Sequence, residues 1–392
     1  MNFNNLIVCR NLLDDKIFDC SQDEFQTAAK LIEKAETLGL SGNLFKSYLI
    51  YKLAHDTNLI SETVEVNGGK VGESLKKIFV RDIEILLPIF LEEKFSTALE
   101  QIKNYQPTKQ NKIESLIELE KNLENLRDAE KIVEVFIDHY KKFGTGDIAA
   151  CRDFRWDSEN KNLVGIKNFE NISLADLIGY AHQKELLTKN TKAFLDKKPA
   201  NNVLLVGARG TGKSSGVKAL VNEFYSEGLR LVQITKPQLK ELSKIMNALS
   251  KFANKRFIIF LDDLSFDESE SEYKYLKSAI EGGVEPRPEN VLIYATSNRR
   301  HLVREQDFED RYNDDSVNET ISLSDRFGLI IHYYAPTQTE YLEIIRHMLK
   351  KNGVDLEGEE LRVEGLRWEM SHSGRNGRTA KQFVNFYLGQ VK

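Results

Sequence analysis

One short glycine-rich stretch constrains the fold of this chain more than any other part of the sequence. Residues 204–216 are LLVGARGTGKSSG, and the segment from Gly207 to Ser214 follows the pattern G-x-x-x-x-G-K-S. This pattern predicts a phosphate-binding loop, in which glycines let backbone N–H groups point at phosphate oxygens at the N-terminus of a helix. Such a loop joins a buried strand to a helix. The apolar run 202–206 and the helical pattern 214–228 lie where that arrangement requires them.

The same stretch also matches the nucleophile elbow of serine hydrolases, G-x-S-x-G, from Gly212 to Gly216. An elbow places its serine on a tight turn directly after the strand. Here the tract GARGTG and a lysine separate Ser214 from the end of the strand near Val206. The elbow pattern also gives no role to that lysine. We therefore interpret Ser214 as a metal ligand and not as a nucleophile.

The residues of the loop have separate predicted roles. Lys213 is expected to reach the β- and γ-phosphates of ATP, and Ser214 is expected to ligate Mg²⁺. The predicted nucleotide-binding residues of the loop are Gly207, Ala208, Arg209, Gly210, Thr211, Gly212, Lys213, Ser214 and Ser215.

The second half of the chain alternates short apolar runs with helical segments. The runs are continuously apolar and rich in β-branched residues, which is typical of strands covered on both faces in a parallel sheet. They lie at residues 202–206, 229–234, 256–261, 290–296 and 328–334. The pattern predicts an α/β fold with five parallel strands.

Two aspartates follow the third of these apolar runs. Asp262 and Asp263 come directly after residues 256–261, and ligands bind at the carboxyl ends of strands in open α/β sheets. A phosphate loop also requires an acidic side chain to hold the metal ion. We expect Asp262 to hold Mg²⁺ directly or through water, and Asp263 to polarise the attacking water as a general base.

Three further side chains are candidates for catalysis. Asn298 follows the run 290–296, where its amide is expected to orient the water or contact the γ-phosphate. Arg326 precedes the last apolar run, and Arg378 lies in the last helical segment. An arginine stabilises charge that develops on a transferred phosphoryl group, whether its own chain or a neighbour supplies it.

Taken in chain order, these pieces resemble the motifs of AAA+ ATPases. The glycine loop resembles Walker A and the aspartate pair Walker B, while Asn298 resembles sensor 1, Arg326 the arginine finger and Arg378 sensor 2. The resemblance covers residues from about 170 to 392. It implies a five-stranded parallel P-loop core followed by a small helical lid.

The resemblance also implies which residues surround the nucleotide. Residues 174–187, LADLIGYAHQKELL, resemble the stretch before Walker A whose backbone, near Ile178 and Gly179 here, holds the adenine. By the same resemblance, Arg326 would act on the nucleotide of the adjacent subunit. Arg378 would act from the lid of its own subunit.

Several longer segments resemble one particular family. The segments are NNVLLVGARGTGKSS, LDDLSF, EGGVEPRPENVLIYATSNRRHL, SLSDRFG and GRTAKQF. They resemble a bacterial family of predicted AAA+ ATPases catalogued as domain of unknown function 815, which implies a fold and nucleotide chemistry but no substrate. Asp263 departs from the common AAA+ pattern, because most members have the longer glutamate there. The paired aspartates resemble those of bacterial replication initiators and helicase loaders, and Glu268 or a water relay could compensate for the shorter side chain.

The sequence predicts four segments. Residues 1–145 have helical periodicity and form a mainly α-helical N-terminal domain of unknown role, in which residues 112–143 are expected to form one long helix. A linker at 146–172 follows the breaker FGTGD, and the P-loop core spans 173–335. The helical lid spans 336–392.

Composition favours a soluble cytoplasmic protein. The net charge is -5, and the three cysteines are widely spaced, which excludes a disulfide framework and a zinc ribbon. The most apolar stretch, residues 83–91, contains Glu84 and Pro88 and is too short to span a bilayer. The N-terminus has no basic region of the kind that begins a signal peptide.

The predicted activity is hydrolysis of ATP to ADP and phosphate. We expect a head-to-tail homo-oligomer that remodels or loads a macromolecular partner, because an arginine finger acts in a neighbouring chain. The alternative is a slow nucleotide-gated switch or scaffold whose ATP-bound state is read by a partner protein. A threading unfoldase is disfavoured, because residues 235–255 contain no aromatic–apolar–glycine trio.

A third alternative is a DNA-binding protein that resembles initiators and helicase loaders. It depends on the paired aspartates and on Arg299, Arg300 and Arg304. The acidic net charge and the strongly acidic stretch 305–319 disfavour it, because acidic side chains repel a phosphate backbone.

Overall fold

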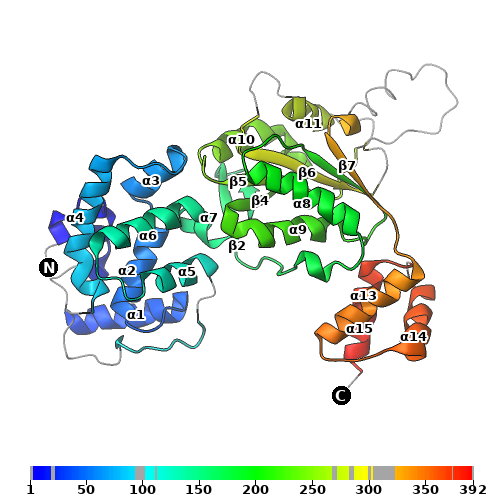
Figure 1. The fold of residues 1–392 in the computed structure, drawn as a ribbon, viewed down its shortest axis with the longest axis horizontal. Helices are drawn as coiled ribbons and strands as arrows, with labels where there is room; N and C mark the ends of the chain where they lie inside the picture. Colours follow the sequence, from blue (N-terminus) through cyan, green and yellow to red (C-terminus); the bar gives the residue numbers. More distant parts are fainter. Residues whose placement is uncertain are drawn as a thin grey trace. The chain divides into compact units, whose positions relative to one another are not determined.

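The chain forms two compact units in the computed structural model (Figure 1). One contains Met1–Cys151 together with Lys251–Lys255, and the other contains Arg152–Ser250 and Arg256–Lys392. The structure describes residues 3–18, 23–92, 102–110, 113–266, 272–281, 287–298, 302, 323–372 and 374–390.

The N-terminal unit is mainly helical, as predicted. Its helices pack around one apolar core that includes Phe79, Phe136 and Tyr140. They are α1 (Glu24–Leu38), α2 (Leu44–His55), α3 (Leu59–Val66), α4 (Glu73–Phe90), α5 (Glu114–Leu123), α6 (Ala129–Lys142) and α7 (Gly146–Ala150), after the 3₁₀ turns η1 (Phe3–Asn5), η2 (Arg10–Asp14) and η3 (Lys16–Phe18). The prediction of one long helix at 112–143 is wrong, because the helical conformation is interrupted after α5. Asn125 adopts a positive φ of 64°, and Asp128 then caps α6 by accepting a hydrogen bond from Lys131 N at 3.0 Å.

Two buried charged side chains stabilise this unit. The Asp82 carboxylate on α4 accepts hydrogen bonds from the backbone N–H groups of residues 7–9, at 2.7 Å for Val8. Lys255 donates through Nζ to Tyr140 O at 3.2 Å and Lys141 O at 2.8 Å, which are carbonyls of the last turn of α6. A cation is favoured there because the helix dipole is negative at the C-terminus.

The second unit is built on a sheet in which the described residues contribute seven strands, in the order β2-β1-β4-β5-β6-β3-β7 (Figure 1). The strands are β1 (Asp153–Asp157), β2 (Asn162–Ile166), β3 (Val203–Gly207), β4 (Leu229–Gln233), β5 (Arg256–Leu261), β6 (Val291–Ser297) and β7 (Leu329–Tyr333). The five predicted strands are β3 to β7, and all their pairings are parallel. Their carboxyl ends therefore lie at one edge of the sheet.

The segment 146–172, which was predicted to be a linker, is largely folded. Residues 146–172 contain α7, β1 and β2, and β1 pairs in parallel with β4 while β2 returns antiparallel to β1. Phe154 and Trp156 alternate with more polar residues and are buried, so this hairpin extends the sheet. The turn between the two strands is Ser158 to Lys161, where Lys161 has a positive φ.

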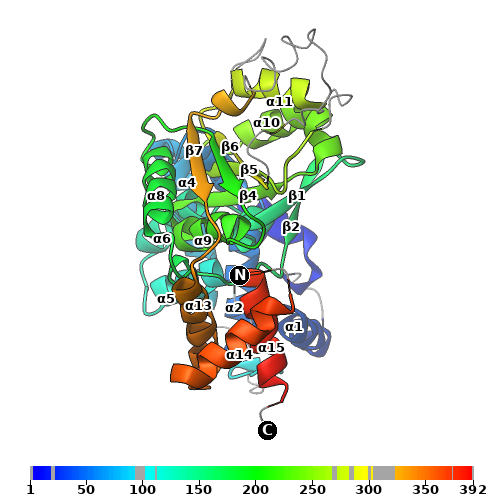
Figure 2. The same cartoon turned by 90° about the vertical axis from the view of Figure 1, so that its right-hand side faces the viewer.

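Helices cover the sheet and form the lid. An apolar core joins α8 (Ala181–Leu195) and α9 (Lys213–Phe224) to one face of the strands, while α10 (Leu242–Ser250) packs beside α11 (Glu272–Glu281) and contacts β6. The predicted lid is confirmed as three helices, α13 (Gln338–Lys351), α14 (Gly358–Met370) and α15 (Gly377–Leu388), with their own apolar core (Figure 2). No helix among the described residues is both long and apolar enough to cross a membrane.

Candidate functional site

The glycine loop connects β3 to α9 as the sequence predicts. Gly207 has a φ of +149°, and a Cβ there would lie 1.9 Å from Tyr333 O on the neighbouring strand. Gly210 and Gly212 have φ values of +73° and +86°, which only glycine adopts at low cost. These glycines bend the chain so that the loop closes around the side chain of Lys213.

Lys213 is enclosed by the loop. Its Nζ donates to Gly207 O and Ala208 O, both at 2.8 Å, and to Asn298 Oδ1 at 3.0 Å. Burial lowers the pKa of this ammonium, and the nearby Asp263 and Asp262 carboxylates act in the opposite direction. A buried ammonium inside a loop of backbone N–H groups can bind the phosphates of a nucleotide.

Oxygen donors meet beside the loop, at the end of β5. Ser214 Oγ donates to Asp262 Oδ1 at 2.5 Å, so the two predicted metal ligands lie next to each other. Thr296 on β6 also donates to Asp262 Oδ1, at 2.6 Å, and accepts a hydrogen bond from Asp263 N at 2.9 Å. A hydroxyl and a carboxylate are hard oxygen ligands of the type that Mg²⁺ takes together with phosphate oxygens and water, so these residues fit the ion.

Asp263 and Asn298 are also adjacent. Asn298 Nδ2 donates to Asp263 Oδ1, while its own Oδ1 accepts from Lys213. Asn298 therefore connects the ammonium of the loop to the predicted general base. Asp263 is exposed and has a φ of 54°, an uncommon conformation that directs the chain away from β5. A cavity of about 480 Å³ adjoins Asp262 and Asp263 on the side of β4 and β1.

The lid contacts the glycine loop directly. Gly377 N donates to Gly210 O at 2.8 Å, and a Cβ on Gly210 would meet Asn376 Oδ1 at 2.5 Å. Asn376 caps α15 by accepting from Thr379 N at 2.9 Å, which fixes the first turn of that helix. Arg378 is exposed in the same turn, one residue beyond the contact with the loop. Asn376 was not among the predicted site residues, although an asparagine directly before a helical segment is typical of a helix N-cap.

The predicted adenine segment lies between the loop and the lid. Leu177 lies against the start of α9, where a Cβ on Gly212 would meet Leu177 Cδ2 at 3.6 Å. Ile178 packs on the apolar core of the lid. Gly179 has a φ of +79°, and its Cα faces Glu340 of α13, since a Cβ there would lie 3.7 Å from Glu340 Oε1.

Arg326 lies away from the phosphate loop of its own chain. It precedes β7, and β7 runs parallel to β3 with Leu329 opposite Val203 and Tyr333 opposite Gly207. Arg326 therefore lies at the amino edge of the sheet, opposite the edge that holds the loop. The strand β7, which spans roughly 16 Å at about 3.3 Å per residue, therefore separates Arg326 from the loop. Arg326 forms an ion pair with Glu281 of α11 in its own chain.

Four residues to which the sequence gave a possible role lie outside the described residues. These are Glu268 and the arginines Arg299, Arg300 and Arg304. Among the described residues, no group of three or more His, Cys, Asp or Glu side chains could hold a metal ion.

Comparison with known proteins gave one family match and several structural likenesses. The family model described as "Protein of unknown function (DUF815)" matches residues 149–391. No curated protein sequence matches the chain. Similar solved structures include the Thermotoga maritima RuvB Holliday junction branch migration motor, at 20% identity and a TM-score of 0.39 over 54% of this chain and 63% of that one. The structure of C. elegans PCH-2 is similar at 16% identity and a TM-score of 0.38, over 56% of this chain and 65% of that one, so this chain spans less than two thirds of either.

Proposed function

The chain belongs to the family described as "Protein of unknown function (DUF815)", and we propose that it binds ATP with Mg²⁺ and hydrolyses it to ADP and phosphate. The observation that supports this proposal is the hydrogen-bonded cluster at the carboxyl edge of the sheet. Its side chains come from three different strand ends. Asn298 joins Lys213 to Asp263, Asp262 binds Ser214, and Thr296 connects the two groups through Asp262 Oδ1 and Asp263 N. Each of these side chains has a separate task in phosphoryl transfer.

The chain's own residues divide the chemistry as follows. Lys213 binds the β- and γ-phosphates, while Ser214 and Asp262 hold Mg²⁺, which supplies charge neutralisation on the phosphate oxygens. Asn298 holds Asp263 Oδ1, so the remaining oxygen, Oδ2, accepts the proton of the attacking water. Asp263 is exposed, so water has access to this carboxylate.

We infer that the active form is a head-to-tail oligomer. Arg326 lies at the sheet edge opposite its own phosphate loop, which supports a role for its guanidinium at the nucleotide of another subunit. A contact in which one subunit gives Arg326 and the next gives the loop is heterologous, and repeated contacts of this kind form a ring or a helix. The work driven by such an assembly is the remodelling or loading of a macromolecular partner.

The alternative is a slow nucleotide-gated switch. Two observations favour it: Asp263 is one methylene shorter than the glutamate usual in AAA+ proteins, and its Oδ1 is already bonded to Asn298. The lid contact between Gly377 and Gly210 supplies an arrangement that a bound nucleotide could stabilise and a partner protein could read.

Complementation between two inactive variants of the full-length chain tests the proposal. Arg326→Ala and Asp263→Asn are each expected to bind ATP but to release phosphate at least about tenfold more slowly than the unmodified chain. In an equimolar mixture, some interfaces combine an intact Asp263 with an intact Arg326 from the neighbour, and phosphate release should partly recover. Lys213→Ala is the control. It should abolish nucleotide binding in its own site and should not rescue Asp263→Asn, because neither chain then has an intact site, but it should rescue Arg326→Ala, to which it still supplies an intact Arg326.

The outcomes separate the two functions. A monomer that hydrolyses ATP at full rate and is insensitive to Arg326→Ala contradicts the oligomer. ATP binding with turnover that stays slow at every protein concentration supports the switch. A chain that binds no ATP refutes both.

A further inference from the structure

One segment connects the phosphate-loop helix to the lid. This segment, residues 170–180, is here called the strap. On the side of α9, Asn222 Nδ2 donates to Glu170 O and Ile172 O, both at 2.9 Å, and Leu177 lies against Gly212. The strap is therefore attached to the helix that begins at the phosphate loop.

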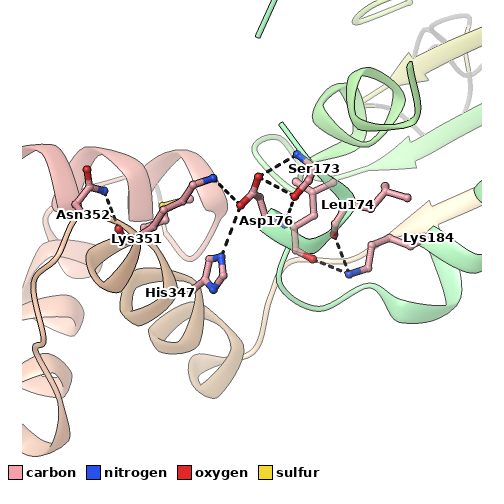
Figure 3. A network of polar contacts seen from close by, with 9 residues as sticks. Ser173, Leu174, Asp176, Lys184, His347, Lys351 and Asn352 are labelled. Atoms are coloured by element: carbon pink, nitrogen blue, oxygen red, sulfur yellow. Dashed lines mark hydrogen bonds and ion pairs between the residues drawn. The ribbon is translucent and has the colours of Figure 1, made fainter. Parts of the chain in front are cut away.

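On its other side the strap holds α13 of the lid (Figure 3). Lys351 Nζ donates to Asp176 Oδ1 at 2.7 Å, and His347 Nε2 lies 3.8 Å from the same oxygen. Both side chains extend from the last two turns of α13 toward the single carboxylate of Asp176. Next to this contact, Ile178 of the strap packs into the apolar core of the lid.

Contacts within the strap hold the Asp176 carboxylate in place, independently of the lid. Its second oxygen, Oδ2, accepts from Ser173 N and Ser173 Oγ, each at 2.9 Å, in a capping box. Lys184 Nζ donates to Leu174 O at 3.3 Å and Leu177 O at 2.8 Å, which holds the turn in place (Figure 3). Oδ1 therefore has a set direction and is presented to Lys351 and His347.

Asp176 is charged at every pH at which the protein is expected to work. Burial raises the pKa of this carboxyl, but the ion pair with Lys351 and the hydrogen bonds from Ser173 outweigh burial and hold the pKa at about 2. The side chain of Asp176 is 24% exposed and that of Lys351 is 60% exposed. A partly exposed ion pair of this kind can break and re-form without unfolding either element.

We propose that Asp176, through its contacts with Lys351 and His347, is a latch that holds the lid on the strap and slows the release of adenine nucleotide. This inference rests on the proposed nucleotide binding. The strap includes Ile178 and Gly179, the residues expected to hold the adenine, so a lid that leaves the strap uncovers that side of the nucleotide. Asp176 is a positioning residue, and it touches neither the phosphates nor the metal ligands.

The test is the rate at which a fluorescent N-methylanthraniloyl ADP leaves the full-length chain when chased with excess ADP. Asp176→Asn keeps an oxygen that can accept from Ser173 but removes the charge that attracts Lys351, and Lys351→Gln removes the other partner. Each is expected to accelerate dissociation about two- to fivefold, the range of a partly exposed ion pair, with little change in the association rate. The double variant should be no faster than either single one, because both remove the same contact.

A neighbouring lysine gives a matched control. Lys350 lies beside Lys351 on α13 but pairs with Glu357 within the lid, at 2.8 Å. Lys350→Gln should leave the dissociation rate unchanged. Raising the salt concentration should accelerate dissociation from the unmodified chain and from Lys350→Gln, but not from Asp176→Asn, because salt screens the ion pair.

Three results overturn the latch. They are an unchanged dissociation rate in Asp176→Asn, an effect of Lys350→Gln as large as that of Lys351→Gln, and additive effects in the double variant. If the unmodified chain binds no ADP, the proposed function and the latch fail together. If it binds ADP and loses binding in Lys213→Ala while the latch variants behave as the unmodified chain does, the latch alone fails.

Discussion

Replacement of Thr296 by valine would remove one hydroxyl group from the centre of the candidate site. Thr296 is 2% exposed on β6, and its Oγ1 contacts both aspartates at the end of β5. It donates to Asp262 Oδ1 at 2.6 Å and accepts from Asp263 N at 2.9 Å. Valine has nearly the same shape, so the change removes hydrogen bonds and leaves the packing of the strand intact.

The expected loss follows from the two hydrogen bonds. A hydrogen bond to a charged group contributes about 1.5–3 kcal/mol, and this is the contact that orients Asp262. The N–H of Asp263 is near solvent and can bond to water, so its loss adds less. If the whole contribution of the first bond is needed in the transition state, phosphate release slows by about ten- to a hundredfold, since each 1.36 kcal/mol is a factor of ten.

The assay compares phosphate release with nucleotide binding in the same preparations. Thr296→Val should slow release while leaving the affinity for ADP without Mg²⁺ within about twofold, because Lys213 and the glycine loop are untouched. Thr296→Ser is the matched control, since it keeps the hydroxyl and loses only a methyl group. It should retain most of the activity.

Equal activity in Thr296→Val and the unmodified chain would refute the reasoning, because the aspartates would then not need the hydroxyl. A large loss in Thr296→Ser as well would also refute it, since the methyl group and not the hydroxyl would matter. A parallel loss of ADP affinity would mean that the variant disturbs the loop.

Three further predictions concern the free energy of unfolding, measured by urea titration. Gly207→Ala should destabilise the chain by about 3 kcal/mol or more, since its Cβ would lie 1.9 Å from Tyr333 O in a paired strand; a loss below about 1 kcal/mol would contradict this. Asp153 is 1% exposed, and burial raises its pKa to about 6, so the stability it gives is complete below about pH 4 and is lost as the pH rises through 6. Asp153→Asn should therefore be more stable than the unmodified chain at pH 8, by up to about 3 kcal/mol, and no more stable at pH 4. Asp82→Asn should cost about 2 kcal/mol, because a neutral amide replaces the carboxylate that binds the N–H groups of residues 7–9, whereas an unchanged midpoint would show that these bonds contribute nothing.

The parallel strands could be predicted because the apolar residues of each strand indicate, without knowledge of its neighbours, that the strand is buried. Residues 257–261 are apolar without a break, and β5 (Arg256–Leu261) contains that run with every residue buried. The hairpin of β1 and β2 lacks such a run, and its place in the sheet depends on the edge of β4. Arg155 and other polar residues alternate along it, which is typical of an edge that is covered on one side only.

The single long helix expected at 112–143 shows a different limit. Helical periodicity continues on both sides of the break, so the apolar pattern alone could not locate it. The local evidence was Asp128, a good N-cap in front of the apolar positions of α6. A capping residue inside a periodic stretch therefore deserves more weight than continuity of the pattern.

Buried charges could not be predicted at all. Lys255 is completely buried, yet its sequence neighbourhood, SKFANKRF, is that of an ordinary polar turn. Its partners are carbonyls of residues 140 and 141, more than a hundred positions away. The contact of the strap with the lid could not be predicted either, because Asp176 and Lys351 are 175 residues apart in the sequence.

One property of parallel sheets explains which parts of the candidate site could be predicted. A residue that directly follows a strand lies at the carboxyl edge, so the loop after β3, the aspartates after β5 and Asn298 after β6 meet there without any knowledge of their partners. A residue that precedes a strand lies at the opposite edge, and Arg326 precedes β7. The same rule that assembles the site therefore separates Arg326 from it by at least the length of a strand. For this reason the position of Arg326 in the fold, and not only its resemblance to an arginine finger, favours a site completed by a second copy of the chain.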